Sequence, residues 1–432
     1  MSTSAASSTE PRSRAPGTAA ARHYLDHAAT TPPRPAALDA FVRASAGHNA
    51  SSLHADGRAA RSMLEDAREE IAELLGAAPA EVVFTSGGTE ADNLGILGAA
   101  RAALAGGADT RVLVSAAEHH SVLDAAEQAG REGARVALVP VSPEGAPTAA
   151  AMRAELAAMS AEGPGSARAT EKPAYVFGAM HANNEIGTLT GTAELAGIAA
   201  AAYGVGGHFH VDAVQSAGHV HVDFAASGAD SMSMSGHKFG APIGIGALLA
   251  RRTARIQQLG FGGGQERDLR SGSVNVPGAV AMAVALRESI AEMDAEARRL
   301  VALRDRLATE ILSAVPGSRL VGPAEPGGFS RRLPGNVNIV FPGSEGESMI
   351  MLLDERGISC STGSACTAGV AEPSHVALAT GMGAADARSV LRFTLGHTST
   401  DADVDAVLRA MPEVAAKARS SAVTGSRLRP GR

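Results

Sequence analysis

The chain has 432 residues, of which 45% are hydrophobic and 19% are charged, a composition that suits a globular protein with a large core. The net charge of -7 argues against direct nucleic-acid binding, and two cysteines are too few for a disulfide framework or a cysteine-rich metal site. Neither a signal peptide nor a long apolar run is visible, so we expect a cytoplasmic protein with no membrane partner.

The first part of the chain alternates between strand and helix patterns. Residues 1–20 are polar and low in complexity, which predicts a disordered tail. Strands are predicted at 81–85, 111–115, 136–141, 174–180, 208–211, 230–234 and 246–250. Helices are predicted at 34–46, 57–75, 91–97, 121–130, 149–161 and 192–203. This alternation predicts an α/β fold with a mostly parallel sheet, covered on both faces, that binds ligands at the carboxyl ends of its strands.

The pattern changes after residue 272. A long helix is predicted at 277–314, followed by strands at 333–341, 358–360 and 391–395 and helices at 347–356 and 401–419. We interpret this region as a smaller α+β domain. The predicted division is a tail (1–20), an N-terminal segment of the small domain (21–38), a large domain (39–276), the small C-terminal domain (277–420) and a disordered tail (421–432).

A glycine-rich turn follows the strand at 81–85. Ser86–Glu90 reads Ser-Gly-Gly-Thr-Glu and opens a helix, and free backbone N–H groups at such a helix start can bind an anion. The dinucleotide and P-loop nucleotide fingerprints are both absent, so a cofactor phosphate is favoured over a nucleotide. An ordinary strand–helix turn remains an alternative for this motif alone.

Lys238 and Asp212 form the pattern around which the chemistry is predicted. Lys238 lies just past one strand, and Asp212 lies at the end of an earlier one. Pyridoxal phosphate (PLP) enzymes need a lysine that holds the cofactor and an aspartate that keeps its pyridine nitrogen protonated. A lone lysine is usually a surface charge, so the surrounding motifs have to carry the assignment.

Eight motifs, in order, resemble the signatures of the cysteine desulfurases. These enzymes are PLP-dependent, have fold type I and are related to class-V aminotransferases. The motifs are His23–Thr31, Ser86–Glu90, Glu118–His120, His181–Gly187, His210–Ser216, Ser235–Lys238, Arg270–Ser273 and Gly363–Cys366. The resemblance covers roughly residues 23–415 and implies a homodimer with a large and a small domain.

The resemblance also implies how the cofactor ring is held. Lys238 is expected to form the Schiff base with PLP, and Asp212 to pair with the pyridine nitrogen. Gln215 is expected to hydrogen-bond the ring hydroxyl, with Asn184 nearby. His119 is expected to stack on the ring face and to shuttle a proton.

A second set of residues is expected to hold the cofactor phosphate. Gly88 and Thr89 lie at the helix start, and Ser235 and His237 are expected to add donors. Ser273 occupies a position where the family usually has threonine, and it is expected to reach in from the other subunit.

Substrate binding is expected to involve Arg392 and Asn49. Arg392 is the candidate clamp for the carboxylate of L-cysteine, because its planar guanidinium matches two oxygens. Asn49 is expected to assist. The family usually has proline after this asparagine, and the chain has Ala50 instead, which makes the loop less constrained.

Cys366 is expected to be the nucleophile that takes the sulfur. By resemblance, its thiolate attacks the sulfur of PLP-bound cysteine, which leaves a persulfide on Cys366 and releases L-alanine. The loop 361–373 is rich in small residues and resembles the long catalytic loop of the group that serves iron–sulfur cluster assembly and tRNA thiolation. Cys360 ends an apolar run and is expected to be a buried hydrophobic residue.

The sequence leaves one close alternative function open and disfavours two others. A selenocysteine lyase, or another PLP-dependent cysteine lyase, would not require Cys366. A non-catalytic partner on the same fold is disfavoured because the motif residues are intact. Paired histidines such as His208 and His210 lack a third ligand nearby, so no metal is expected. The sulfur acceptor, either an iron–sulfur scaffold protein or a tRNA-thiolation enzyme, has no readable motif.

Overall fold

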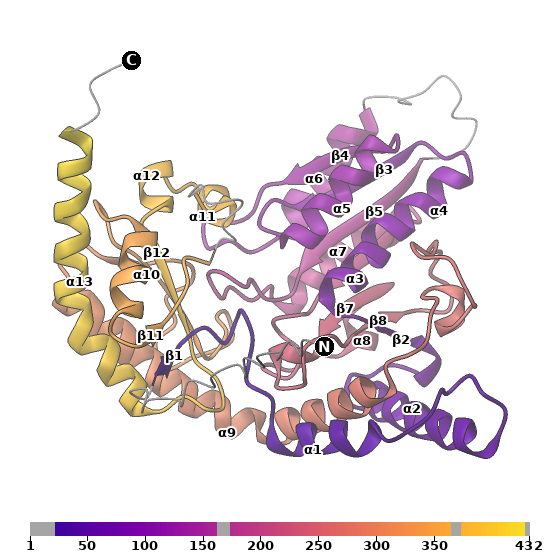
Figure 1. Cartoon of the computed structure of the whole chain (residues 1–432). Coiled ribbons are helices and arrows are strands. Elements are labelled where there is room, and N and C mark those ends of the chain that lie inside the picture. The colour runs from indigo at the N-terminus through magenta and orange to yellow at the C-terminus, as the bar shows by residue number, and fades with distance from the viewer. Residues whose placement is uncertain (1–21, 162–172, 364–372, 428–432) are drawn as a thin grey trace, which may run out of the picture.

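One long helix, α9 (Val276–Ala314), runs beneath both halves of the chain in the computed structural model, which describes residues 22–161, 173–363 and 373–427 (Figure 1). The Asn275 side chain caps its start by accepting a hydrogen bond from Gly278 N, and Pro277 occupies the first turn, where its missing N–H costs nothing. The first half of α9 packs in the core of the larger half of the molecule, and the second half packs in that of the smaller one.

A seven-stranded sheet forms the centre of the larger half. Its strand order is β2-β8-β7-β6-β5-β3-β4. Their bounds are β2 (Val82–Thr85), β3 (Thr110–Ser115), β4 (Arg135–Val139), β5 (Ala174–Met180), β6 (His208–Asp212), β7 (Ser231–Ser235) and β8 (Gly246–Ala250). Only β8 runs antiparallel to its neighbours, so the predicted mostly parallel sheet is confirmed.

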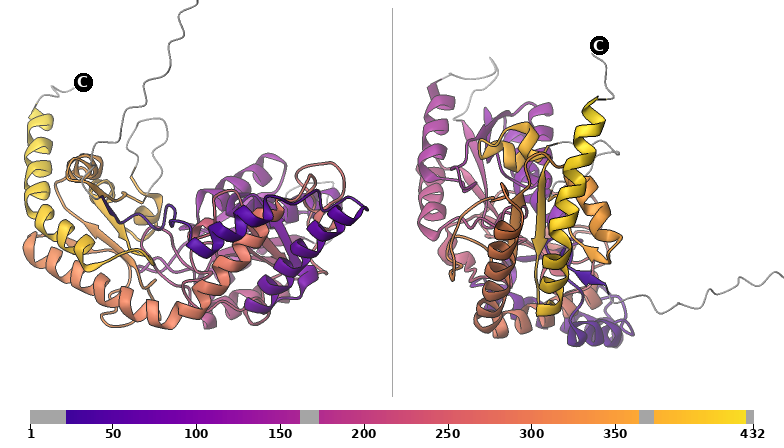
Figure 2. Two further views of the ribbon diagram at one scale, coloured as in Figure 1. Left: turned by 60° about the horizontal axis from the view of Figure 1, so that its bottom comes forward. Right: turned by 90° about the vertical axis from the view of Figure 1, so that its left-hand side faces the viewer.

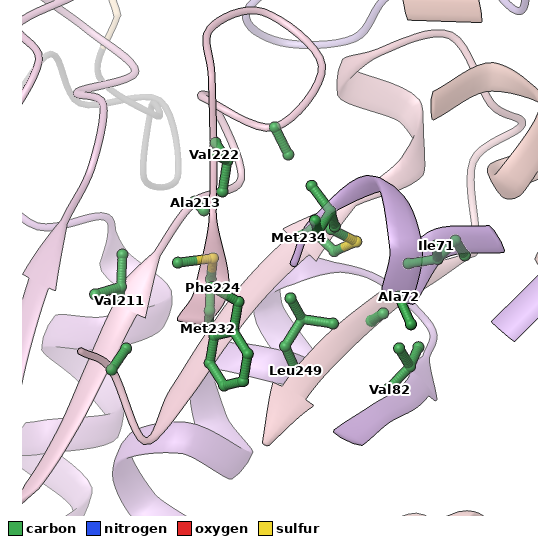
Figure 3. Close-up of a cluster of buried hydrophobic side chains, with 14 of the residues drawn as sticks. Ile71, Ala72, Val82, Val211, Ala213, Val222, Phe224, Met232, Met234 and Leu249 are labelled. Atoms are coloured by element: carbon green, nitrogen blue, oxygen red, sulfur yellow. The ribbon is translucent and has the colours of Figure 1, made fainter. Parts of the chain in front are cut away.

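Helices cover both faces of this sheet (Figure 2). They are α1 (Pro35–Ala44), α2 (Ala55–Leu74), α3 (Gly88–Asn93), α4 (Ala99–Ala105), α5 (His120–Arg131), α6 (Ala149–Ala161), α7 (Thr192–Gly204) and α8 (Phe224–Ser227). Figure 3 shows part of the core on one face, where Ile71 of α2 lies near Met234, and Phe224 lies near Met232 and Leu249 of the sheet. Burial on both faces accounts for the mainly apolar sequences of β5 and β8, whereas β6 and β7 alternate polar and apolar residues.

The helix after the glycine-rich turn differs from the prediction. It begins at Gly88 instead of residue 91, and a π-helical turn (Leu94–Gly98) separates α3 from α4. Gly95 in this turn lies against β6, where a Cβ atom would come within 2.1 Å of His210 Nδ1. Only glycine, which has no Cβ atom, therefore fits at this position.

The smaller half contains a three-stranded antiparallel sheet of order β12-β10-β9. Its strands are β9 (Arg319–Leu320), β10 (Asn336–Val340) and β12 (Val390–Thr394), and its helices are α10 (Gly346–Asp354), α11 (His375–Ala379), α12 (Ala384–Ala387) and α13 (Asp401–Arg427). The N-terminal strand β1 (His23–Tyr24) pairs in parallel with β11 (Ile358–Ser359), and Leu25 is buried in the same core. The domain boundaries stay predictions, because α9 contributes to both cores.

Helix α13 continues to Arg427, eight residues past the end predicted at residue 419, so the expected disordered tail at 421–432 is partly helical. No proline follows Pro412 in this helix, and extending an existing helix costs little free energy per residue, so the helix can continue to Arg427. Within the described residues, no helix combines the length and apolar character that crossing a bilayer requires. In the same ranges, no three His, Cys, Asp or Glu side chains are grouped to hold a metal ion.

Replacing Leu25 with alanine should test how strongly the N-terminal segment holds the smaller half together. Leu25 is 0% exposed, and truncating a buried leucine costs about 2–5 kcal/mol. We expect Leu25→Ala to lower the denaturant midpoint of unfolding. The control is Leu138→Ala on the edge strand β4, where Leu138 is 56% exposed. Equal midpoints for the two variants would contradict the packing described here.

Candidate functional site

A cavity of about 390 Å³ lies at the carboxyl ends of β6 and β7, between the two halves of the molecule. Ten of the thirteen predicted site residues line it. They are Gly88, Thr89, His119, Asn184, Asp212, Gln215, Ser235, His237, Lys238 and Arg392. Met180 of β5 lies opposite Asp212 of β6 in the sheet register, so the strand ends meet at one edge, as parallel strands require.

Lys238 lies in a 3₁₀ turn (Gly236–Lys238) directly after β7. Its Nζ donates hydrogen bonds to the carbonyl oxygens of Ala28 and Ala29, at 2.6 and 3.0 Å. Burial, with a further contribution from the positive charge of Arg392, lowers the pKa of Lys238 to about 8. A substantial fraction of the amine is therefore neutral near physiological pH, which a nucleophile or proton acceptor needs.

Asp212 ends β6 inside the protein. Its Oδ1 accepts a hydrogen bond from Val214 N at 2.8 Å, and Ser233 Oγ lies 3.5 Å away. Burial, with a further contribution from the nearby charge of Asp92, raises the pKa of Asp212 to about 7. Among the described residues no cationic side chain forms an ion pair with Asp212, so the site favours a protonated nitrogen from a bound group.

The start of α3 lines the end of the cavity where the sequence predicts an anion site. The first N–H groups of a helix have no carbonyl partner within it, and Gly88 and Thr89 provide such groups here. A Cβ atom on Gly88 would come within 2.5 Å of Val214, so only glycine lets this turn approach the segment after β6. Ser235 and His237 lie on the same cavity wall, so hydroxyl, imidazole and amide donors converge as a phosphate requires.

His119 caps the start of α5. Its Nδ1 accepts a hydrogen bond from Ser121 N at 3.1 Å and lies 2.7 Å from Ser121 Oγ. Burial lowers the pKa of His119 to about 4, and the positive charge of Lys238 contributes. The ring is therefore neutral near physiological pH and can lie against a flat cofactor ring.

Arg392 of β12 enters the cavity from the smaller half. Its Nη1 donates to the Asn184 carbonyl oxygen at 2.8 Å, and its Nη2 donates to Asp26 Oδ1 at 2.7 Å. Two buried atoms here have no hydrogen-bond partner in the described structure, Arg392 Nε and Asn184 Oδ1. Buried polar atoms without partners are costly, so these two fit contacts to a bound ligand.

The structure does not bring Asn49, Ser273 and Cys366 into this cavity. Asn49 Oδ1 accepts a hydrogen bond from Ser51 N at 2.9 Å, and Asn49 is exposed. Ser273 is also exposed and does not line the cavity of its own chain. Cys366 lies outside the described residues, although Ser361 and Gly363 of the same motif region line the cavity. The roles of all three stay predictions.

Sequence reasoning missed three acidic and polar residues of the site. Asp26 orients Arg392, and the only clue to Asp26 in the sequence was its position in the first motif, His23–Thr31. Asp92 and Ser121 line the cavity beside His119, and both lie within three residues of a recognised motif. Neither residue had a readable role, because their contact joins two helices that are distant in sequence.

Comparison with known proteins gives consistent results. The family model for class-V aminotransferases matches residues 23–407. The IscS-like cysteine desulfurase of Mycobacterium tuberculosis is 46% identical over 93% of this chain and 98% of its own length. A solved NifS-like protein matches with a TM-score of 0.80 at 27% identity, over 92% of this chain and 100% of its own. A structure described as SspA in complex with cysteine matches with a TM-score of 0.69 at 28% identity, over 88% and 100%.

The raised pKa of Asp212 predicts how stability depends on pH when no cofactor is bound. The folded protein holds this proton more tightly than the unfolded chain, so rising pH between about 4 and about 7 removes stability. The loss is at most about 1.4 kcal/mol per pH unit. We expect cofactor-free Asp212→Asn to escape this loss in urea unfolding. Asp124→Asn, whose side chain is 74% exposed, should behave like wild type. An unchanged pH dependence in Asp212→Asn would contradict the assignment.

Proposed function

The chain belongs to the class-V aminotransferase family and, within it, to the cysteine desulfurases, and on this basis we propose that its cavity converts L-cysteine to L-alanine and transfers the sulfur to Cys366. The observation that carries this proposal is the meeting of Lys238, Asp212, His119 and Arg392 in one cavity.

The cofactor of this family is pyridoxal 5'-phosphate, and the residues of the cavity fit it. The bound cofactor supplies an electron sink that weakens bonds at the substrate Cα. Lys238 would hold it covalently and Asp212 would pair with its ring nitrogen. His119 would lie on the ring face, with Gln215 and Asn184 near the ring hydroxyl. Gly88, Thr89, Ser235 and His237 would bind its phosphate.

Lys238 is proposed to move the proton at the substrate Cα. Its lowered pKa lets Nζ alternate between a neutral amine and an ammonium near physiological pH. The carbonyl oxygens of Ala28 and Ala29 can accept hydrogen bonds from either form, so they keep Nζ at one place while its charge changes. The surrounding buried residues exclude water, which disfavours the ammonium form and keeps part of the Lys238 amine neutral.

Arg392 is proposed to bind the substrate carboxylate. A guanidinium has five N–H groups, and the contacts to Asn184 and Asp26 use one from each terminal nitrogen. The unpartnered Nε–H and the remaining groups are then available to two carboxylate oxygens. The Asp26 carboxylate fixes the orientation of the fork before the substrate arrives.

Cys366 is proposed as the sulfur acceptor. Its thiolate attacks the substrate sulfur, the substrate Cβ–S bond breaks, the sulfur becomes bonded to Cys366 Sγ as a persulfide, and the carbon fragment leaves as alanine after protonation. The other cysteine is poorly suited to this step. Burial, together with the charge of Asp26, raises the pKa of Cys360 to about 12, so it supplies almost no thiolate.

Three further features belong to the same proposal. A homodimer is supported by the exposed apolar side chains of Leu53, Ile243 and Phe261, and by the position of Ser273 outside its own cavity. The proposed sulfur acceptor is a protein, either an iron–sulfur scaffold or a tRNA-thiolation enzyme. The expected cytoplasmic location is kept as a prediction.

A single-turnover assay with L-cysteine tests the proposal. Alanine and protein-bound persulfide are measured for wild type, Cys366→Ala and the matched control Cys360→Ala. We expect both products in wild type and in the control, and neither in Cys366→Ala, because only Cys366 can provide the thiolate. If Cys366→Ala keeps forming alanine at the wild-type rate, the protein is a lyase such as a selenocysteine lyase and the proposed sulfur transfer is wrong.

Replacing Arg392 with lysine tests the carboxylate clamp. Lysine keeps the charge but loses the two-pronged geometry, so we expect KM for L-cysteine to rise about tenfold or more. Arg388→Lys is the control, because Arg388 is exposed and does not line the cavity. The clamp assignment fails if steady-state kinetics give Arg392→Lys and Arg388→Lys the same KM.

A further inference from the structure

An ion pair outside the cavity joins a distant segment to the first turn of helix α3. Arg270 Nε donates a hydrogen bond to Glu90 Oε1 at 3.1 Å, and Arg270 Nη1 also donates to the Ser273 carbonyl oxygen at 3.4 Å. Glu90 belongs to the first turn of α3, and neither member of the pair lines the cavity. The Arg270 and Glu90 side chains are 26% and 29% exposed, so the pair is partly shielded from water. Neither residue has a role in the proposed function.

Glu90 supports the shape of the glycine-rich turn. Its second carboxyl oxygen, Oε2, accepts a hydrogen bond from Ser86 N at 2.6 Å. A glutamate in the first turn of a helix commonly reaches back in this way to a backbone N–H group at the helix start. Because Ser86 opens the turn that leads into α3, the carboxylate at residue 90 has a structural reason to be there.

The charge of Glu90 is nevertheless unfavourable for an anion bound at the same helix start. Gly88 and Thr89, which line the cavity, immediately precede it. Helix α3 continues without a break through the π-helical turn into α4, so its start is the positive end of a long helix dipole. A carboxylate in this position uses part of the favourable potential and repels a second anion.

Glu90 is ionised in the folded protein. Burial raises its pKa, but hydrogen bonds from Ser86 and the charge of Arg270 outweigh this effect, so the pKa lies below its ordinary value. Without a partner, this negative charge would oppose a phosphate at neutral pH. Arg270 supplies the opposite charge, and the ion pair as a whole carries none.

A strained turn just before Arg270 holds it in place. Residues 266–268 have φ angles of 49°, 61° and 61°, in the left-handed region that residues other than glycine seldom adopt. Such a conformation persists only when the surrounding contacts fix it. Glu266 makes these contacts, because its carboxylate accepts from Arg68 Nη1 and Nη2 at 2.9 and 2.7 Å and from Phe84 N at 2.7 Å.

The strained turn is fastened to the edge of the seven-stranded sheet. Phe84 belongs to β2, the first strand in the sheet order, so its outward N–H group is available to Glu266. Arg267 adds hydrogen bonds to the carbonyl oxygens of Ala80 and Ala250, at 2.9 and 3.0 Å. The fold itself therefore sets the position from which Arg270 reaches α3.

We propose that Arg270 is a positioning residue of the anion site, which neutralises Glu90 so that the start of α3 can bind the phosphate group of the cofactor. Glu90 is needed as the acceptor for Ser86 N, and Arg270 removes the repulsion that this carboxylate would otherwise exert. The inference rests on the proposed function, because it takes PLP to be the group that occupies the cavity. It concerns the affinity for the phosphate and not the chemistry at Lys238.

The test measures the dissociation constant of PLP by equilibrium dialysis, with the full-length protein after removal of the cofactor. The variants are Arg270→Gln, Glu90→Gln and the double variant. We expect Arg270→Gln to raise the dissociation constant about fivefold or more, because an unpaired carboxylate then lies beside the phosphate. The control is Arg131→Gln, which breaks an exposed ion pair to Glu127 on α5 and should bind PLP like wild type.

The double variant distinguishes an effect of charge from an effect of shape. A glutamine at residue 90 can still accept from Ser86 N but carries no charge, so we expect Glu90→Gln to bind PLP within about threefold of wild type. Adding Glu90→Gln to Arg270→Gln should restore the affinity to the same range. The inference is wrong if the double variant binds PLP no better than Arg270→Gln alone.

Pyridoxal, which lacks the phosphate, provides a second measure. Repulsion from Glu90 acts on the phosphate charge, so we expect Arg270→Gln to bind pyridoxal like wild type. The weaker binding of PLP should also approach the wild-type value as ionic strength rises, because salt screens repulsion between partly exposed charges. Equal weakening for pyridoxal and PLP would indicate general damage to the cavity and would contradict the inference.

These binding measurements involve no turnover, so they separate the inference from the proposed function. A protein that shows the expected pattern with PLP but makes no alanine from L-cysteine would keep the role of Arg270 and remove the desulfurase proposal. An active wild type, together with a double variant that keeps the full defect of Arg270→Gln, would do the reverse.

Discussion

The site depends on the short segment from Asp26 to Ala29, which crosses between the two halves of the molecule. The Ala28 carbonyl oxygen accepts hydrogen bonds from Lys238 Nζ and Gln215 Nε2, while Ala28 N donates to Thr394 Oγ1. Asp26 holds Arg392 from the same segment. One short stretch of backbone, which forms a turn at residues 27–29, therefore connects the lysine of the larger half to the arginine of the smaller half. Because strand β1 and Leu25 anchor this stretch in the smaller core, packing far from the cavity sets the distance between these two groups.

Electrostatics in the cavity follow mainly from burial. The same low-dielectric surroundings lower the pKa of Lys238 and of His119 and raise the pKa of Asp212. All three shifts favour the neutral form of the group. A zwitterionic substrate and an anionic cofactor then meet donors and carboxyl groups whose ionisation adjusts to them, which suits a reaction that moves protons repeatedly.

Most of the fold was predictable because buried strands in an α/β protein are nearly continuous apolar runs. The strands β3, β5 and β8 were recognised this way, whereas β6 and β7 alternate polar and apolar residues. The two-residue strand β9 was missed, since so short a segment has no periodicity to detect. The π-helical turn was also missed, because it arises from the fit between Gly95 and His210, two residues that come together only in the folded chain.

The site was predictable to a similar degree and for a related reason. Nine of the ten expected residues meet because each ends or follows a strand, or opens a helix, at the same edge of the seven-stranded sheet, and Arg392 of β12 enters from the smaller half. Asp26, Asp92 and Ser121 were not assigned, since their roles consist of contacts to other side chains and not of a pattern along the chain. Ser273 does not line the cavity of its own chain, and its expected role in a second subunit stays a prediction.

Helix α9 has a consequence for how the molecule comes apart. Its apolar residues, among them Leu286 and Leu303, belong to one core at its beginning and to the other core further along. Neither core is complete without this helix, so loss of one should weaken the other, and the two halves should melt together and not one after the other. Unfolding in a single step would keep Lys238 and Arg392 at their native separation until the whole chain unfolds.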